Sequence, residues 1–180
     1  MALQRCFIAL EIPQEALAEA VRIQSILRKQ ALLEGNFTAS ESIHLTLKFL
    51  GEIPEETIEG VKGRLMEVVI PRGSCTLASA GVFSPHHVRI IWLYLAGDPV
   101  MELQRRVDAS LDGLFAPEQR FMSHITLARV KRLTDKKRLL AVLDAIAINP
   151  ITFFLRSFSL KKSVLTPKGP SYTTIVHYEK

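Results

Sequence analysis

Two segments of the sequence carry a histidine and a threonine in the same order. Residues 44–50 read HLTLKFL and residues 124–130 read HITLARV. In both segments the polar pair alternates with large apolar residues, which is typical of a half-buried β-strand. A single His-x-Thr on such a strand is usually only a solvated sheet face. Two copies in similar positions of one chain indicate a shared function.

Alternation predicts where the side chains of the first copy point. Residues two apart on a strand share a face, so His44 and Thr46 are expected on one side of the strand. Leu45, Leu47 and Phe49 are expected to point into the core. Threonine is β-branched and stiff about its first side-chain torsion, so its hydroxyl is held in place at low entropic cost.

The second copy adds an equivalent pair, His124 and Thr126. Histidine titrates near neutral pH, so one imidazole can serve as a general base and the other as a general acid. Hydroxyl groups are suited to donating hydrogen bonds to phosphate oxygens whose charge shifts in the transition state. Hydrolysis of a cyclic phosphodiester uses all of these groups, and it needs no metal and no cofactor.

The positions of these residues depend on the elements around them. The apolar and turn patterns predict strands at 5–13, 43–50, 75–83, 88–96, 121–130, 151–163 and 171–179. They predict helices at 15–33, from 54, from 98 to 113, and from 134 to 147. Gly35 and Asn36 are expected to end the first helix, and the sequence TPKGPS over 166–171 is expected to form a turn.

Strands and helices mix without a regular βαβ rhythm, and hairpins are plausible in each half of the chain. This favours an α+β fold with antiparallel sheets over a doubly wound parallel sheet. Residues 1–180 are expected to form a single domain of two similar halves, because no Pro-, Gly- or Ser-rich linker interrupts them. Nothing in the sequence suggests an obligate dimer, and we expect a monomer.

Composition limits the functional classes. The net charge of +5 suits a polyanionic partner such as nucleic acid, and the basic residues of 131–138 are interpreted as a solvated helix start. Cys6 and Cys75 lack the spacing of a disulfide framework or a zinc site. The first residues do not resemble a signal peptide, and no apolar run is long enough to span a membrane. We therefore expect a cytoplasmic protein with reduced thiols and no membrane partner.

Five segments together resemble a known family. They are FIAL at 7–10, HLTLKFLGEI at 44–53, GVFSPHHVRIIW at 81–92, HITLARV at 124–130 and LKKSVLTPKGPSY at 160–172. The two HxTx motifs are similar to those of the two-histidine (2H) phosphoesterase superfamily. The ordered set resembles the RNA 2′,3′-cyclic phosphodiesterases, also called 2′-5′ RNA ligases (LigT/ThpR-like).

This resemblance implies a bilobal fold of two pseudo-symmetric lobes, with antiparallel sheets flanked by helices and one motif on each side of a central cleft. It implies metal-independent hydrolysis of RNA 2′,3′-cyclic ends to 2′-phosphates, with His44 as proton donor and His124 as proton acceptor. Thr46 and Thr126 would bind the phosphate. Reversible 2′-5′ joining of RNA ends is a side activity associated with the family, and tRNA fragments are among the RNA partners it suggests.

The resemblance also bears on three neighbouring residues. Arg129 matches an arginine that often follows the second motif and is suited to bidentate phosphate binding. Strict alternation puts it on the face opposite His124, so it reaches the cleft only if the strand twists or bulges. Ser123 stands where the family often has proline, which would only stiffen the strand entry. Phe7 is a candidate for stacking on a base, with a core role as the alternative.

Other histidines and other functions remain open at this stage. His86 and His87 are expected on a loop surface, and His177 lies in the terminal strand, where it could border the cleft. The chain could act instead on a small cyclic nucleotide or an ADP-ribose cyclic phosphate. A third possibility is a module that binds RNA ends without turnover, against which the intact histidines and threonines argue.

Overall fold

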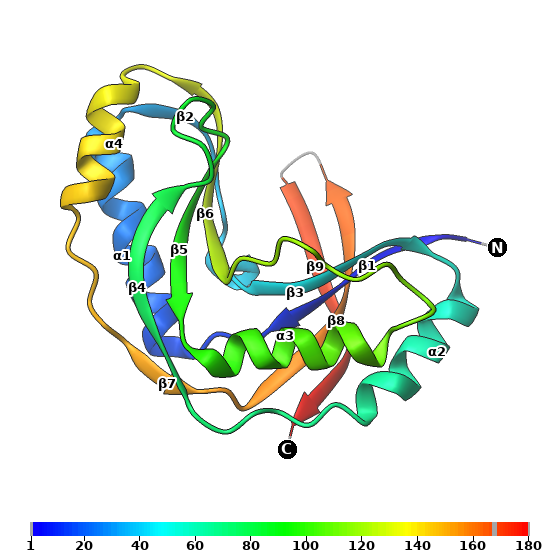
Figure 1. Ribbon diagram of the computed structural model, residues 1–180. Coiled ribbons are helices and arrows are strands. Elements are labelled where there is room, and N and C mark those ends of the chain that lie inside the picture. The colour runs from blue at the N-terminus through cyan, green and yellow to red at the C-terminus, as the bar shows by residue number, and fades with distance from the viewer. Residues whose placement is uncertain (1, 167–168, 180) are drawn as a thin grey trace.

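The structure is a computed structural model that describes residues 2–166 and 169–179 (Figure 1). Its strands are β1 (Gln4–Leu10), β2 (Leu33–Phe37), β3 (Leu45–Ile53), β4 (Ser74–Val82), β5 (Ile90–Ala96), β6 (His124–Leu133), β7 (Thr152–Phe154), β8 (Ser157–Thr166) and β9 (Gly169–Glu179). Its helices are α1 (Gln14–Gln30), α2 (Glu55–Met66), α3 (Asp98–Ser110) and α4 (Lys136–Ala145), with a short 3₁₀ turn at Ser40–Ser42. The turn predicted over 166–171 includes residues 167 and 168, which lie outside the described residues.

The strands form two lobes. In the β1 lobe the neighbours run β3, β1, β8 and β9, and in the β6 lobe they run β7, β4, β5 and β6, with β2 on the other side of β6. All pairings found within the described residues are antiparallel. The α+β class and the bilobal antiparallel architecture predicted from the sequence are confirmed.

The strands of the two lobes form one nine-stranded sheet, in which only one residue pair links β3 to β6 within the part of the chain that the structure describes. Leu45 of β3 pairs with Ile125 of β6. Both side chains are fully buried. Since Leu45 lies between His44 and Thr46, and Ile125 follows His124, the junction of the lobes lies next to both histidines.

The helices cover the outer faces of this curved sheet. Helix α1 packs against β6 and α4 against β4, so both belong to the β6 lobe, whereas α2 packs against β9 and α3. Helix α3 contacts both β3 and β4, and thus bridges the lobes (Figure 1). Among the described residues, no helix is both long and apolar enough to cross a membrane.

The first helix ends earlier than its pattern predicts. It stops at Gln30, and Ala31 takes a left-handed conformation with φ of 50°. The prediction that Gly35 ends a helix was wrong, because residues 33–37 form β2 against β6. A Cβ at Gly35 would lie 2.2 Å from the carbonyl oxygen of Arg129. Glycine is needed at this position for the close approach of two strands, rather than for a helix end.

The long strand predicted over 151–163 is two strands. Strand β7 pairs with β4 in the β6 lobe, while β8 pairs with β1 in the β1 lobe. The chain leaves one lobe and enters the other over residues 155 and 156. A continuous apolar pattern cannot reveal such a change of partner, because both strands bury similar side chains.

Candidate active site

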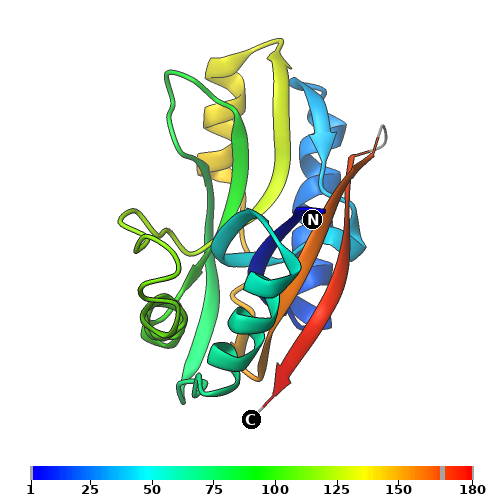
Figure 2. The same cartoon turned by 90° about the vertical axis from the view of Figure 1, so that its right-hand side faces the viewer.

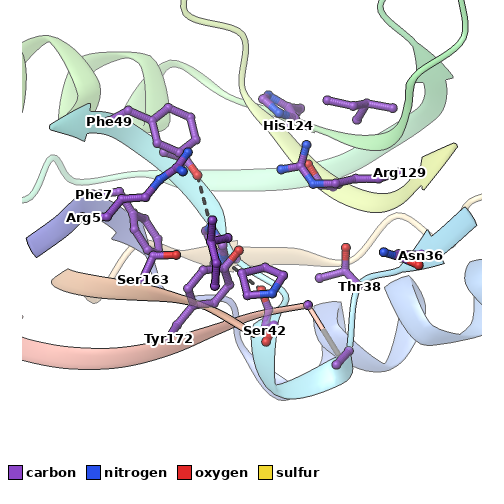
Figure 3. A pocket seen from close by; sticks show the side chains of 18 of the residues that line it. Arg5, Phe7, Asn36, Thr38, Ser42, Phe49, His124, Arg129, Ser163 and Tyr172 are labelled. Carbon is purple, nitrogen blue, oxygen red and sulfur yellow. Dashed lines mark hydrogen bonds between the residues drawn. The ribbon is translucent and has the colours of Figure 1, made fainter. Parts of the chain in front are cut away.

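A cleft of about 720 Å³ lies between the two lobes. Its wall includes His44 and Thr46 from the β1 lobe and His124 and Thr126 from the β6 lobe. Figure 3 shows His124 and Arg129 facing the side chains that the β1 lobe contributes. The structure therefore brings together the two predicted His and Thr pairs, which are 80 residues apart in sequence.

The two imidazoles are held by equivalent hydrogen bonds. The Nδ1 atom of His44 lies 2.7 Å from the carbonyl oxygen of Ser42, and Nδ1 of His124 lies 2.8 Å from that of Met122. A carbonyl oxygen only accepts, so Nδ1 carries a proton in both rings. In the neutral rings Nε2 then has the free lone pair. Each histidine is thus oriented with one nitrogen available for proton transfer.

The two sites differ at the second nitrogen. Nε2 of His44 lies 3.1 Å from the Thr46 hydroxyl, which can donate a hydrogen bond to it. Within the described residues, Nε2 of His124 has no hydrogen-bond partner. The lone pair of His124 is therefore free to accept a proton, whereas that of His44 is already engaged.

Burial makes both imidazoles less basic. It lowers the pKa of His44 to about 4, although the carbonyl of Ser42 opposes the change and Lys161 adds to it. Burial also lowers the pKa of His124, against the effect of the Met122 carbonyl, and the charge of Arg129 lowers it further. Both rings are neutral at pH 7 while the cleft is empty.

A one-residue bulge changes the direction of side chains in both histidine strands. Along β3 the register with β1 skips Leu47, and along β6 the register with β5 skips Leu127. Beyond each bulge the alternation inverts, since an extra residue turns the following side chains to the other face. Phe49 and Arg129 consequently lie on the cleft wall.

The inversion has one predicted and one unexpected result. Strict alternation would have placed Arg129 on the face opposite His124, and the bulge at Leu127 turns it to the cleft instead. The prediction that Phe49 points into the core was wrong, because this ring is 63% exposed. Its position five residues after His44 matches that of Arg129 after His124.

Aromatic rings surround the two histidines. The ring centroid of Phe7 lies 4.9 Å from that of His44, and Tyr172 makes an edge contact with His44 at 5.1 Å. On the other lobe Phe83 makes an edge contact with His124 at 4.8 Å. Phe7 is only 3% exposed, so it packs against the buried side of the His44 ring and offers little surface to a ligand.

Several of these residues were not identified from the sequence. Tyr172 and Phe83 reach the cleft from β9 and from the loop between β4 and β5, far from either motif. Arg5, Asn36 and Thr38 also line it (Figure 3). Residue types alone do not distinguish them, because their role arises from pairing between distant strands.

A buried ion pair fixes the segment that leads to the second motif. Lys48 is 4% exposed and forms an ion pair with Asp108 of α3. It also donates to the carbonyl oxygen of Ala116 at 2.7 Å, and the other oxygen of Asp108 accepts from the backbone of Glu118 at 2.8 Å. The loop between α3 and His124 is thereby tied to β3.

The other histidines lie away from the cleft wall. His86 and His87 are exposed on the loop between β4 and β5, as predicted. His177 contacts the Ser159 hydroxyl at 2.9 Å and Glu179 at 2.8 Å, and it does not border the cleft. Ser123 is buried, and within the described residues its hydroxyl has no partner.

Comparison with known proteins agrees with this architecture. An RNA 2′,3′-cyclic phosphodiesterase of Thermotoga maritima is 34% identical over 95% of this chain and 92% of its own length. One of Methanocaldococcus jannaschii is 28% identical over 95% of this chain and 98% of its own length. The chain is thus similar to relatives of nearly the same extent.

Solved structures share the fold. The crystal structure of Escherichia coli LigT in apo form superposes with a TM-score of 0.78 over 99% of this chain and 98% of that one, at 22% identity. A protein of Thermus thermophilus gives a TM-score of 0.75 at 26% identity, over 97% of each chain. The family described as LigT like Phosphoesterase matches residues 10–92 and 96–172, which include both histidine motifs. The chain belongs to the LigT-like phosphoesterase family.

Proposed function

We propose that this protein hydrolyses the 2′,3′-cyclic phosphodiester at the end of an RNA to a 2′-phosphate, without a metal ion. One observation carries the proposal: two histidines, oriented by equivalent hydrogen bonds, face one cleft, and each is followed by a threonine on the same wall. The names of the curated relatives support the same reaction.

Two proton transfers account for the reaction. Nε2 of His124 removes a proton from water as its oxygen bonds to phosphorus. The bond between phosphorus and the 3′ oxygen breaks, and His44 donates a proton to that oxygen. The product has a 2′-phosphate and a 3′-hydroxyl. The free lone pair of His124 favours its assignment as the base.

The donor role of His44 requires that its ring become protonated. Burial holds its pKa at about 4 in the free protein. A phosphodiester anion in the cleft would raise this pKa, because an opposite charge nearby favours the imidazolium form. The Thr46 hydroxyl would then turn from Nε2 towards a phosphate oxygen. We therefore infer that His44 becomes protonated when the substrate binds.

Phosphate binding is assigned to three other side chains. Thr46 and Thr126 would donate hydrogen bonds to the two non-bridging oxygens. Arg129 carries a positive charge on the same wall and is exposed. Its guanidinium is suited to binding two phosphate oxygens at once.

The RNA bases have aromatic partners in the same cleft. Phe49 and Phe83 are 63% and 49% exposed and lie on different lobes. Stacking on such rings tolerates any base. A small cyclic nucleotide is a second candidate substrate, because a cleft of about 720 Å³ is in the size range of small-molecule sites.

Three further expectations belong to this proposal. We expect one domain that works as a monomer, since the chain crosses between the lobes and neither lobe is a continuous segment. We expect a cytoplasmic location, in which the buried thiols of Cys6 and Cys75 stay reduced. We expect reversible 2′-5′ joining of RNA ends, with tRNA fragments among them, to be a side activity of this same site, in which a 5′-hydroxyl takes the place of water.

The first experiment uses EDTA-treated protein and a short RNA with a 2′,3′-cyclic end. Conversion to a 2′-phosphate, identified by a mass gain of one water and by comparison with authentic 2′- and 3′-phosphate standards, supports the proposal, and the double variant His44→Ala with His124→Ala is the control. A folded protein that binds the RNA without converting it would be a binding module. A folded protein that converts only mononucleotide cyclic phosphates would favour the second candidate.

A further inference from the structure

Positive charge is concentrated at one end of the β6 lobe. Residues 28–34 and 131–138 contain seven lysines and arginines and two acids, Glu34 and Asp135. This local excess of five equals the net charge of the whole chain. The two segments lie together, because the backbone N–H of Thr134 donates to the carbonyl of Leu32 at 3.0 Å. We call this surface the cationic ridge.

The ridge includes cations that local structure does not favour. Helices α1, α2 and α3 each have an acid in the first turn, which interacts well with the positive end of the helix dipole. Helix α4 has none within its first turn, which holds Lys136, Lys137 and Arg138, although Asp135 caps this helix and accepts from the backbone N–H of Arg138 at 2.9 Å. Three positive charges at this end oppose the dipole and repel one another. Asp135 offsets one of these three charges, so a net positive charge remains at the start of α4.

Three of the lysines are also unpaired. Lys131, Lys136 and Lys137 are exposed and have no hydrogen-bond or ion-pair partner in the described parts of the chain. By contrast, Arg132 pairs with Glu34 at 2.6 Å. The ammonium groups of these lysines are therefore available to an external anion.

The ridge is continuous with the cleft. Strand β6 leads from Arg129 on the cleft wall to Lys131, two residues further along the strand, and then towards the start of α4. Figures 1 and 2 both place α4 beside the end of β6. On the opposite wall, Arg5 and Glu52 face each other across β1 and β3, so their charges offset.

We propose that the cationic ridge binds the phosphates of the RNA chain on the 5′ side of the cyclic end. The cyclic phosphate occupies the 3′ end of the RNA, so the remaining chain must leave the cleft, and the ridge is the charged path that begins at its wall. The inference rests on the proposed function. It adds that the protein recognises a run of RNA backbone, without regard to sequence, in addition to the terminal nucleotide.

The test compares two substrates with the same cyclic end, a dinucleotide and an RNA of about twelve nucleotides, which is long enough to follow a charged surface. The variant changes Lys131, Lys136 and Lys137 to glutamine. Its control changes three exposed arginines remote from the cleft, Arg72, Arg105 and Arg156, to glutamine. Both variants lose the same net charge.

For the long RNA, we expect kcat/KM of the ridge variant to fall about tenfold at low salt and to approach the wild-type value at high salt. The slope of log kcat/KM against log salt should become shallower by about 2, since each lost contact to a single strand removes about 0.7. For the dinucleotide the ridge variant should match the wild type. The control variant should change neither substrate by a comparable factor.

An equal loss in the ridge and control variants on long RNA would overturn the inference, because only net charge would then matter. Equal rates of wild type and ridge variant on long RNA would also overturn it. Failure of the proposed function gives a different result, in which wild-type protein leaves even the dinucleotide unconverted. Thermal unfolding should show the ridge variant at least as stable as the wild type, since charges that oppose the α4 dipole are gone.

Discussion

Phe49 and Arg129 occupy equivalent places, each five residues after its histidine and each beyond a one-residue bulge in its strand. One position offers an apolar ring to the cleft and the other a positive charge. The two lobes therefore present the same His and Thr pair to the cleft but different neighbouring side chains. This difference makes the two sides of the cleft unequal: the ring of Phe49 favours a nucleobase on one side, and the charge of Arg129 favours a phosphate on the other.

Replacing Phe49 by alanine should raise KM for an RNA substrate by about tenfold and leave kcat nearly unchanged, because stacking on one ring contributes about 1–3 kcal/mol. Steady-state kinetics on the short cyclic-ended RNA measure the effect. Phe154→Ala is a matched control, since that ring is 65% exposed on β7, away from the cleft. Equal KM values for the two variants would contradict the role of Phe49.

Replacing either His44 or His124 by alanine should lower kcat by about 10²–10⁴-fold, the usual contribution of a positioned acid or base. Circular dichroism should show an intact fold, since both rings lie on the cleft wall. His177→Ala, which removes a histidine away from the cleft, should keep wild-type kinetics. Wild-type rates in either cleft variant would exclude the mechanism.

Replacing Thr46 or Thr126 by valine keeps the shape of the side chain and removes the hydroxyl. Each change should cost about 10- to 100-fold in kcat/KM, the loss expected for one hydrogen bond to a charged group. The effect should be smaller than that of losing a histidine. A change of Thr152, whose hydroxyl contacts Thr76 at 2.8 Å outside the cleft, serves as the comparison.

Replacing Arg129 by methionine should raise KM and also raise the pKa of His124, because the guanidinium lowers that pKa in the wild type. The two effects are separable, since KM comes from kinetics and the pKa from the NMR titration of the His124 ring. Arg129→Lys should restore the charge effect on His124 better than it restores KM, because lysine cannot bind two oxygens in the geometry of a guanidinium. An unchanged His124 titration in the methionine variant would place Arg129 away from that ring.

The pKa of His44 also makes folding stability depend on pH. Its value in the folded protein is about 4, below the value of about 6.5 expected in the unfolded chain. The unfolded state therefore binds a proton first as pH falls, so stability is full above pH 6.5 and is lost progressively down to about 4. Urea unfolding at pH 7 and near pH 4.5 should show a smaller loss for His44→Gln than for the wild type. Equal losses would contradict a buried neutral ring.

The placement of the two His and Thr pairs on one cleft was predictable because it depends on local alternation. The segments around His44 and His124 each contain the full pattern of a half-buried strand, so the shared face of each His and Thr pair follows from residues four apart or less. The antiparallel α+β class followed from the absence of a βαβ rhythm. The repeat of the motif then predicted a shared site.

The rest depends on pairing between distant strands. A bulge exists only relative to a partner strand, so the direction of Phe49 could not be read from β3 alone. Gly35 looked like a helix end because its close contact, the carbonyl of Arg129, is far away in sequence. Tyr172 reaches His44 only because β8 and β9 return beside β1.

The pairing of Leu45 with Ile125, which is the one link between β3 and β6 among the described residues, has a mechanical consequence. Each of these residues lies between the histidine and the threonine of its motif, so the point where the strands of the two lobes join coincides with the two His and Thr pairs. In a rotation about a pivot, displacement grows with the length of the lever arm. Any opening of one lobe against the other would therefore separate the outer rims widely and hardly alter the spacing of the two imidazoles. Under the proposed function, such an opening would admit RNA ends of different bulk at the rim while the distance between the two imidazoles stays nearly constant.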